Sequence, residues 1–225
     1  HFSVFQKTLL QETELFRKEC DGSQDHDMIL RLTGIAKNVV HVPRILYYWR
    51  AHAGSVASNI NAKTYCIDSA KRAVSDHLHK YGIYNTAITS TRAFETIFRL
   101  QYELTTEGMV SVIIPNCDHV EELRKCVEAI RRKNSYENYE ILIAENNSKD
   151  EATCRYYEEL EKDPKVRILK YEGEFNYARI NNFAAKEAKG EFLLLLNNDV
   201  EFINKDFIKE LLMYRKIVRV DEDTL

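Results

Sequence analysis

Three short polar clusters follow apolar runs in the second half of the chain, and their side chains are suited to ligand chemistry. They are residues 115–118 (PNCD), 145–148 (ENNS) and 197–199 (NND). Carboxylate and amide groups of this kind hydrogen-bond a nucleotide base and ribose, and their oxygens hold hard divalent cations. No GxGxxG or GxxxxGK[ST] motif follows the first apolar run, so a diphosphate bound here would need a metal ion rather than a cradle of backbone amides.

The elements that must position these clusters alternate between apolar runs and helical patterns. Strands are predicted at residues 110–115, 140–145, 166–171 and 192–196, and helices at 120–130, 153–161, 177–188 and 207–214. Asp118 and Glu121 resemble a capping pair at the start of the first of these helices. This alternation predicts right-handed βαβ units and a mostly parallel sheet. Ligands of such sheets lie beyond the carboxyl ends of the strands, so we expect the three clusters to share one rim.

The first half of the chain has a different pattern. Residues 1–82 are expected to be mainly helical, with helices at 3–17, 28–35 and 65–78 and two short strands at 39–42 and 45–49. Residues 83–108 are predicted to be a linker with one strand between residues 98 and 104. The expected organisation is therefore a segment 1–82, a linker 83–108 and a βαβ region 109–225.

Composition excludes several classes of protein. The chain has 225 residues, of which 44% are hydrophobic and 30% charged, which is typical of a globular protein of about one and a half domains. Its 32 basic and 35 acidic residues give a net charge of −3, which argues against nucleic acid as a partner. The longest apolar run, 192–196, is far shorter than the ~20 residues of a membrane span. Five cysteines without a CxxC spacing fit reduced thiols in the cytoplasm.

The βαβ region carries a family resemblance. Residues 110–115 (VSVIIP), 145–148 (ENNS), 175–182 (FNYARINN) and 193–199 (LLLLNND) resemble the nucleotide-sugar-binding half of a family 2 glycosyltransferase with the Rossmann-like GT-A fold. The resemblance covers residues 109 to about 214 in the family's motif order. The fold class expected from it is α/β, with a mostly parallel sheet and flanking helices, preceded by a mainly helical acceptor-half segment.

The resemblance implies roles for individual residues. Nucleotide contacts would come from the strand ends and the helix that follows them, at Pro115, Asp118, Glu145, Asn147, Asn182, Asn197 and Asn198. Asp199 would hold a divalent metal, Mn²⁺ or Mg²⁺, together with the donor diphosphate, although Asn197 replaces the first carboxylate of the family's Asp-x-Asp motif. Plainer roles remain open: a solvated loop acid for Asp199, a helix cap for Glu145 and a structural contact for Asn182.

Two motifs near the start of the chain resemble the acceptor half of the same family. Residues 22–31 (GSQDHDMILR) are similar to the acidic motif in which one carboxylate is the general base, which implies that role for Asp25. Residues 47–55 (YYWRAHAGS) are similar to the segment that closes the active site, where His52 could reach the metal or the diphosphate. An exposed, purely structural histidine is the alternative for His52.

The order of the two halves is reversed relative to one complete module. The simplest hypothesis is the end of one catalytic module, a linker and the start of the next, within a larger reading frame. The expected activity is inverting transfer of a hexosyl or deoxyhexosyl group from a UDP- or dTDP-linked donor to a cell-surface glycan, at the cytoplasmic face of the membrane. The competing hypotheses are an inactive fragment that only binds nucleotide or assists assembly, and a permuted single domain. Self-association would complete the truncated halves.

Overall fold

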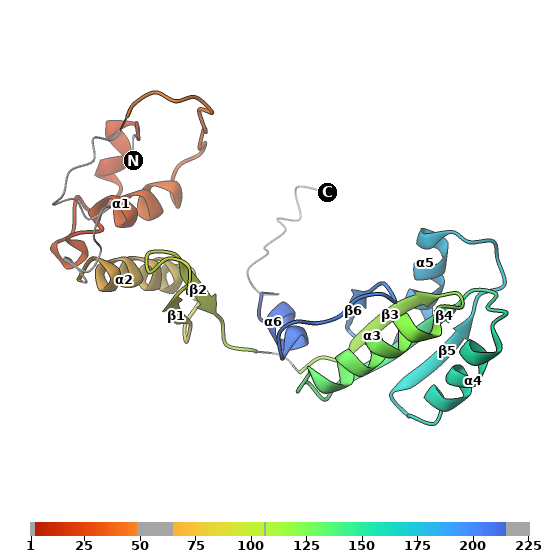
Figure 1. Cartoon of the computed structure of the whole chain (residues 1–225). Helices are drawn as coiled ribbons and strands as arrows, with labels where there is room; N and C mark the ends of the chain where they lie inside the picture. The colour runs from red at the N-terminus through yellow and green to blue at the C-terminus, as the bar shows by residue number, and fades with distance from the viewer. Residues whose placement is uncertain (1–2, 49–64, 106, 215–225) are drawn as a thin grey trace. The chain divides into compact units, whose positions relative to one another are not determined.

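The computed structural model describes residues 3–48, 65–105 and 107–214 (Figure 1). The chain divides into two compact units, His1–Glu103 and Leu104–Leu225. Within the described residues, no helix combines the length and apolar character needed to cross a bilayer.

The first unit is built on two packed helices. Its elements in chain order are the 3₁₀ turns η1 (Lys7–Gln11) and η2 (Lys18–Cys20), the helices α1 (Gln24–Thr33) and α2 (Tyr65–Lys80), and the strands β1 (Ala87–Ser90) and β2 (Phe98–Gln101). Met28 and Leu32 of α1 are buried, as are Ala70 and Ala73 of α2. The short alanine side chains let the two helices approach closely, and α2 ends where Gly82 adopts a positive φ of 72°.

Two predictions for this unit are wrong. In place of a helix over residues 3–17, the structure has the single turn η1 followed by irregular chain. No strand forms in the described part of the predicted strands, residues 39–48, where Val40 and Ile45 are 81% and 82% exposed. The β-branched side chains favour an extended backbone, but a strand also needs a hydrogen-bonding neighbour, and no described segment pairs with this one.

The predicted linker contains a hairpin rather than a single strand. β1 and β2 pair antiparallel, in a register from Ala87↔Gln101 to Ser90↔Phe98. The strand expected from residue 98 onward is β2, whereas its partner β1 falls in a polar stretch without a strand signal.

The second unit is an α/β sandwich around a parallel sheet. Its elements are β3 (Val110–Asn116), α3 (Val120–Arg132), β4 (Tyr139–Glu145), α4 (Glu151–Leu160), β5 (Val166–Lys170), α5 (Tyr177–Glu187), β6 (Phe192–Leu195) and α6 (Phe207–Met213). The strands are ordered β5-β4-β3-β6, and every neighbouring pair is parallel. The α/β fold class predicted from the sequence is confirmed.

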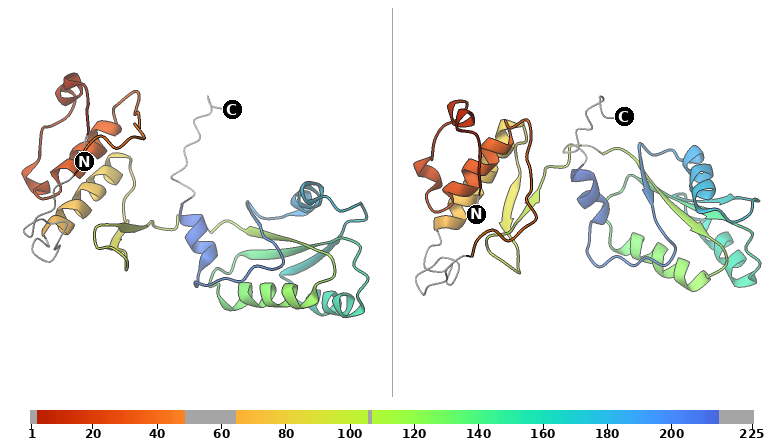
Figure 2. Two further views of the ribbon diagram at one scale, coloured as in Figure 1. Left: turned by 45° about the horizontal axis from the view of Figure 1, so that its top comes forward. Right: turned by 90° about the horizontal axis from the view of Figure 1, so that it is seen from above.

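Helices cover both faces of the sheet (Figure 2), and alternate residues of the two central strands belong to the cores on opposite faces. Val112 and Ile143 pack against α3, α4 and α6, whereas Ile113 and Leu142 pack against α5. Because both faces are covered, the central strands are almost continuously apolar, as the sequence pattern predicted. β6 is at the edge of the sheet, and Leu193 and Leu195 of this strand are 49% and 50% exposed.

A buried polar cluster around Glu140 fixes one end of the sheet. The polar clusters at residues 115–118, 145–148 and 197–199 follow the strands at the other end. The Glu140 carboxylate accepts hydrogen bonds from Ser111 Oγ at 2.7 Å, from the Lys189 backbone N–H at 2.7 Å and from Arg167 Nη1 at 3.2 Å. Gly190 completes the cluster by donating its N–H to Ser111 Oγ at 2.8 Å. A β-carbon at position 190 would lie 2.5 Å from the Ser111 nitrogen, so this close approach requires glycine.

Candidate functional site

The carboxyl ends of β3, β4 and β6 meet at one rim, as the strand order requires. The ends of β3 and β4 are aligned by the pair Asn116↔Glu145. β6 joins β3 through the Leu196 N–H, which donates to the Ile113 carbonyl at 2.9 Å. The three polar clusters, 115–118, 145–148 and 197–199, therefore follow neighbouring strands at one edge of the sheet.

Asn116 is the buried centre of this rim. Its Nδ2 donates to the Asp118 carbonyl at 2.7 Å and to the Tyr157 hydroxyl at 2.7 Å, while its Oδ1 accepts from Asn198 Nδ2 at 2.6 Å. Tyr157 belongs to α4, and its hydroxyl is also 3.2 Å from Ser148 Oγ. Burial raises the pKa of Tyr157 above the usual value for a tyrosine, and the protonated hydroxyl bridges Asn116 and Ser148 at neutral pH. One amide thus joins the ends of β3 and β6 to α4.

A pocket of about 310 Å³ opens at the rim. Its wall combines polar strand-end groups with two apolar side chains from the β5–α5 loop and α5, and consists of Pro115, Asn116, Cys117, His119, Asn146, Phe175, Ile180 and Asn198. Phe175 is 74% exposed and offers an aromatic face, whereas the asparagines offer amide donors and acceptors. A flat, polar-edged ring such as a nucleobase fits this combination of surfaces.

The Asp118 carboxylate holds the loop after the neighbouring strand. Its Oδ1 accepts from the backbone N–H groups of Lys149 and Asp150 at 2.7 and 2.8 Å, and the Asp118 N–H donates to Ser148 Oγ at 2.9 Å. The predicted N-cap role is wrong: the cap position of α3 is His119, which has a positive φ of 55° and no capping side-chain hydrogen bond. The Asp118 carboxylate therefore makes a contact between two loops and does not cap α3.

Glu145 has a comparable local role. One of its carboxylate oxygens accepts from the Ser148 N–H within the β4–α4 loop. The N-cap of α4 itself is Asp150, whose carboxylate accepts from the Thr153 N–H at 3.0 Å. Glu145 is half-buried and does not line the pocket, so any ligand contact would come from its remaining carboxylate oxygen.

Two further asparagines attach the loop that carries Phe175. Asn146 Nδ2 donates to the carbonyls of Tyr171 and Gly173 at 3.1 and 2.8 Å, and Asn147 Nδ2 donates to the Gly173 carbonyl at 3.1 Å. Asn147 has a positive φ of 59°, a conformation that asparagine tolerates better than most residues. The part of this loop that precedes Phe175 is therefore attached to the end of β4.

The predicted metal position has one exposed carboxylate. Asp199 and Asn197 are both exposed in the loop after β6, and the Asn197 carbonyl accepts a hydrogen bond from Cys126 Sγ at 3.7 Å. Among residues 3–48, 65–105 and 107–214, no three His, Cys, Asp or Glu side chains form a metal-binding group. A single carboxylate fits an ion that takes its other ligands from phosphate oxygens and water, as Mg²⁺ does. His52, the second predicted ligand, lies outside the described residues.

Asn182 is exposed on α5, whereas its neighbour Asn181 is buried. Asn181 Nδ2 donates to the Tyr177 carbonyl at 2.8 Å, one turn earlier on the helix. Its Oδ1 is buried and has no hydrogen-bond partner among the described atoms. Neither residue lines the pocket.

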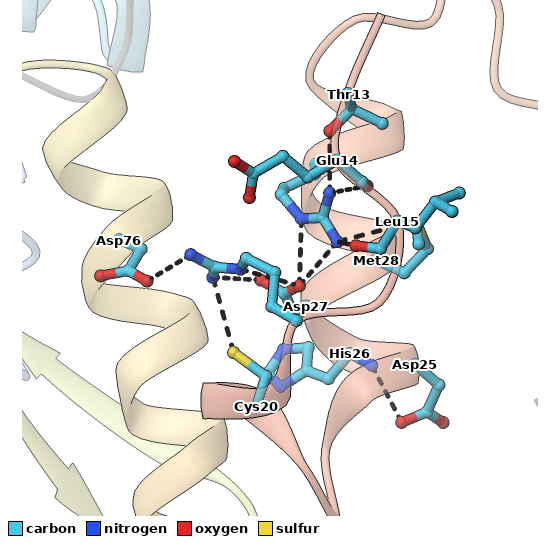
Figure 3. A network of polar contacts seen from close by, with 11 residues as sticks. Thr13, Glu14, Leu15, Cys20, Asp25, His26, Asp27, Met28 and Asp76 are labelled. Carbon is cyan, nitrogen blue, oxygen red and sulfur yellow. Dashed lines mark hydrogen bonds and ion pairs between the residues drawn. The ribbon is translucent and has the colours of Figure 1, made fainter. Parts of the chain in front are cut away.

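Asp25, the predicted base, is in the first unit. It is exposed in the first turn of α1, and its Oδ1 accepts from the His26 N–H at 2.9 Å. Asp27, two residues later, is buried between Arg17 and Arg31 (Figure 3). Burial alone would raise the pKa of Asp27, but the hydrogen bonds from Arg17 and Arg31 outweigh that effect and hold it below its usual value.

Of the predicted nucleotide-binding residues, the structure places Pro115 and Asn198 in the pocket wall. Sequence reasoning missed Asn116, Asn146 and Phe175. Asn116 and Asn146 belong to the polar clusters 115–118 and 145–148 that the sequence analysis identified. The apolar pattern of the preceding strand does not indicate which residue of each cluster points into the pocket. Phe175 is the first residue of the motif at 175–182, and its place in that otherwise largely polar motif is the signal that could have identified it.

Comparisons with known proteins find a family model, two relatives and a solved structure that are similar to this chain. Residues 111–216 match the model described as Glycosyl transferase family 2. The chain is 34% identical over 215 residues to Uncharacterized protein y4gI of Sinorhizobium fredii (strain NBRC 101917 / NGR234), covering 94% of the chain and 23% of that protein. It is 33% identical over 211 residues to O-antigen biosynthesis protein RfbC of Myxococcus xanthus, covering 94% of the chain and 16% of that protein. The chain thus spans less than a quarter of either relative.

Among solved structures, the chain is similar to mannosyltransferase PcManGT from Pyrobaculum calidifontis, determined in complex with GDP-Man and Mn²⁺. That match has a TM-score of 0.45 and 15% identity, and it covers 68% of this chain and 42% of the other.

Proposed function

Because residues 111–216 belong to glycosyl transferase family 2, we propose that the chain is part of an enzyme of polysaccharide biosynthesis that transfers a sugar from a nucleotide-diphosphate donor to a glycan. The observation that carries the proposal is the pocket beyond β3, β4 and β6, where amide groups and an exposed aromatic ring converge. The O-antigen biosynthesis protein among the relatives supports a glycan as the acceptor.

In the proposed donor site, the nucleobase packs on Phe175 and Pro115, and the amide of Asn198, which is held in place by Asn116, hydrogen-bonds its edge or the ribose. The free sides of the Asp118 and Glu145 carboxylates face the ribose hydroxyls. Asn147, Asn182 and Asn197 are assigned to the periphery of the donor, because they are exposed and do not line the pocket. The proposed donors are UDP- and dTDP-linked hexoses or deoxyhexoses.

Asp199 is the proposed carboxylate ligand of a divalent metal at the donor diphosphate, with Asn197 and His52 as further candidates. Mn²⁺ or Mg²⁺ bound there would stabilise the negative charge that develops on the departing diphosphate. The role of the protein is to fix Asp199 on the short loop after β6, next to Asn198 and the pocket.

Asp25 is the proposed general base of an inverting displacement. Its carboxylate takes the proton of the acceptor hydroxyl while that oxygen bonds to the anomeric carbon and the bond to the nucleotide diphosphate breaks. The new glycosidic bond then has the opposite anomeric configuration, and no covalent enzyme intermediate forms. An exposed carboxylate in the first turn of a helix is accessible to an acceptor.

Asp25 and Asp199 are in different units, and we assign them to two consecutive modules of a longer protein. The alignments to both relatives support this assignment, since each covers 94% of the chain but less than a quarter of the relative. Residues 1–82 are then the acceptor-side end of one module, residues 83–108 the linker, and residues 109–225 the donor-side start of the next. We place the enzyme in the cytoplasm, at the inner face of the membrane, and a second copy is the proposed partner that would complete the truncated halves.

The donor site is tested by thermal unfolding of the chain with UDP-glucose or dTDP-rhamnose, each with and without Mn²⁺. A ligand present at 100 times its Kd stabilises the folded state by about 2.7 kcal/mol, which raises Tm by several degrees. Absence of any shift with both donors would contradict the donor-site assignment. Release of nucleoside diphosphate, measured in the same samples, separates an active transferase from a fragment that only binds.

A further inference from the structure

Asp25 and Asp27 point to different sides of α1. Two consecutive steps of about 100° separate their side chains on the helix, so they lie on nearly opposite faces. The Asp27 side chain is 3% exposed, whereas Asp25 is an exposed residue. In Figure 3, Asp25 lies on the far side of Asp27 from Asp76, a residue of α2. The burial of Asp27 therefore determines the direction in which Asp25 points.

Two guanidinium groups hold the buried carboxylate. Arg17 reaches both Asp27 oxygens, with Nη2 at 2.5 Å from Oδ1 and Nε at 3.2 Å from Oδ2. Arg31, one turn later on α1, reaches Oδ2 with Nη2 at 2.8 Å and Nε at 3.0 Å. Such forked contacts restrict orientation as well as distance, which a single ammonium group does not do.

Arg17 also connects Asp27 to the second helix. Its Nη1 is 2.9 Å from Asp76 Oδ2 on α2, and its Nη2 is 3.5 Å from the buried Cys20 Sγ of η2. One side chain thus contacts α1, α2 and the turn before α1. Arg31 instead ties α1 back to the chain before η2, through Thr13 Oγ1 and the Leu15 carbonyl, each at 2.8 Å.

The residues that begin α1 are anchored to α2 as well. Ser23, at the N-cap position, donates from Oγ to the Cys66 carbonyl at 2.8 Å instead of capping its own helix. Gly22 has a positive φ of 86°, and a β-carbon there would lie 2.5 Å from Cys66 Sγ. Asp25 stands between this anchor and Asp27, so the turn that carries it is fixed on both sides.

We infer that Arg17 is a positioning residue for Asp25: through Asp27 and Asp76 it fixes the first turn of α1 so that Asp25 faces the acceptor side. The inference rests on the proposed role of Asp25 as the base. It assigns to Arg17 a function beyond stability, because Asp76 and Asp27 belong to separate helices and only Arg17 is hydrogen-bonded to both among the described contacts.

The test compares Arg17→Gln, Arg17→Lys and Asp76→Asn in the 225-residue chain by NMR. The readouts are the ¹⁵N order parameters of residues 24–27 and the carboxyl ¹³C chemical shift of Asp25. Arg17→Gln should lower the order parameters from about 0.85 to below 0.6, the values of rigid and flexible backbone, and shift the Asp25 signal. Arg17→Lys, which keeps the charge and one contact, should recover part of the change, and Asp76→Asn should show a smaller change of the same kind.

Unchanged order parameters and an unchanged Asp25 signal in a folded Arg17→Gln variant would overturn the inference. If Arg17→Gln does not fold, the graded response of Arg17→Lys and Asp76→Asn decides, and a wild-type signal in both overturns the inference.

Turnover separates this inference from the proposed function. With UDP-glucose or dTDP-rhamnose as the donor, Asp25→Asn should abolish nucleoside diphosphate release, whereas Arg17→Lys should lower kcat about tenfold and leave the KM for the donor unchanged. Release that survives Asp25→Asn contradicts the base itself. Release that is lost in Asp25→Asn but unaffected in Arg17→Lys contradicts only the positioning role.

Discussion

Asn198 donates a side-chain hydrogen bond of 2.6 Å to Asn116, and this contact joins the loop after β6 to the buried end of β3. Asn116 is only 4% exposed and already donates to Tyr157, so its amide is fully engaged. Both residues line the pocket. The stability of the rim and the binding of a ligand should therefore depend on the same pair.

Asn116→Ala should destabilise the second unit by about 1–3 kcal/mol, because it leaves the hydroxyl of Tyr157 and the amide of Asn198 without their buried partner. Asn198→Ala should cost less stability, since Asn198 is only half-buried, yet weaken nucleotide binding to a similar extent. Urea unfolding and UDP titration measure the two effects. Asn138→Ala removes an exposed amide bonded to the Glu107 carbonyl and is the matched control. If Asn116→Ala and Asn198→Ala bind UDP as tightly as the control Asn138→Ala, the pair does not contribute to the nucleotide site.

Asp199→Ala should abolish the part of the thermal shift that depends on Mn²⁺ and leave the metal-independent part. The reason is that Asp199 supplies the carboxylate of the proposed ion, while the pocket wall is unchanged. Glu201→Gln removes an exposed charge two residues away and serves as the control. A metal-dependent shift that persists in Asp199→Ala would refute the assigned ligand.

Nucleotide should protect Cys117 from alkylation and leave Cys154 unprotected. Both thiols are free and exposed, but Cys117 lines the pocket and Cys154 is on α4 away from its wall. Partial burial and the nearby Asp118 and Glu145 carboxylates raise the pKa of Cys117 above that of an ordinary thiol, so its labelling should be slow at neutral pH and accelerate in alkaline solution. Mass spectrometry after iodoacetamide treatment, with and without UDP, measures both sites in one sample. Equal protection of the two thiols would indicate a general change in accessibility instead of occupancy of the pocket.

Asp27→Asn should destabilise the first unit by about 3–5 kcal/mol, because it removes the charge that compensates two partly buried guanidinium groups. Asp25→Asn, two residues away but exposed, should change stability by less than about 0.5 kcal/mol. Chemical denaturation followed by circular dichroism compares the two. Similar losses in both variants would show that burial does not separate the roles of these carboxylates.

Both units should lose stability in acid. The pKa of Glu140 is below its usual 4.5: burial raises it, but the hydrogen bonds from Lys189, Ser111 and Arg167 outweigh burial. The pKa of Asp27 is likewise below 3.8. A carboxyl group with a depressed pKa contributes stability that is complete above its unfolded-state value and is lost as pH falls through the folded-state value.

Unfolding free energies measured between pH 6 and pH 2.5 should therefore decline below about pH 4.5, the unfolded-state pKa of Glu140. Glu140→Gln should have lower stability at neutral pH and a flatter dependence on pH in this window. A variant with the same slope as the wild type would show that Glu140 is not a source of the acid sensitivity.

The βαβ region could be predicted closely from the sequence. The predicted bounds of its strands and helices agree with the structure to within two residues, because buried parallel strands are continuous apolar runs and their connecting helices have a regular apolar stripe. The shared rim of the three polar clusters follows from the same pattern, since parallel strands end on one side. The local pattern of apolar residues is therefore sufficient to predict most of the secondary structure of the βαβ region.

The side-chain roles at the rim could not be predicted in the same way. Asp118 has the spacing of a helix cap, but its carboxylate binds loop N–H groups more than 30 residues later in the chain. In the first unit, Arg17 stands in a predicted helix, yet it is held by contacts with α1 and α2. Each of these residues is determined by a partner distant in sequence, which periodicity does not reveal.

The edge strand β6 has a practical consequence for handling the protein. Parallel sheets normally have both faces covered, but Leu193 and Leu195 of β6 are half-exposed. One edge of β6 also has no neighbouring strand among the described residues. Uncovered apolar edge strands are templates for aggregation. Residues 104–214 produced alone should precipitate as concentration rises, and a lysine at position 193 should improve their solubility.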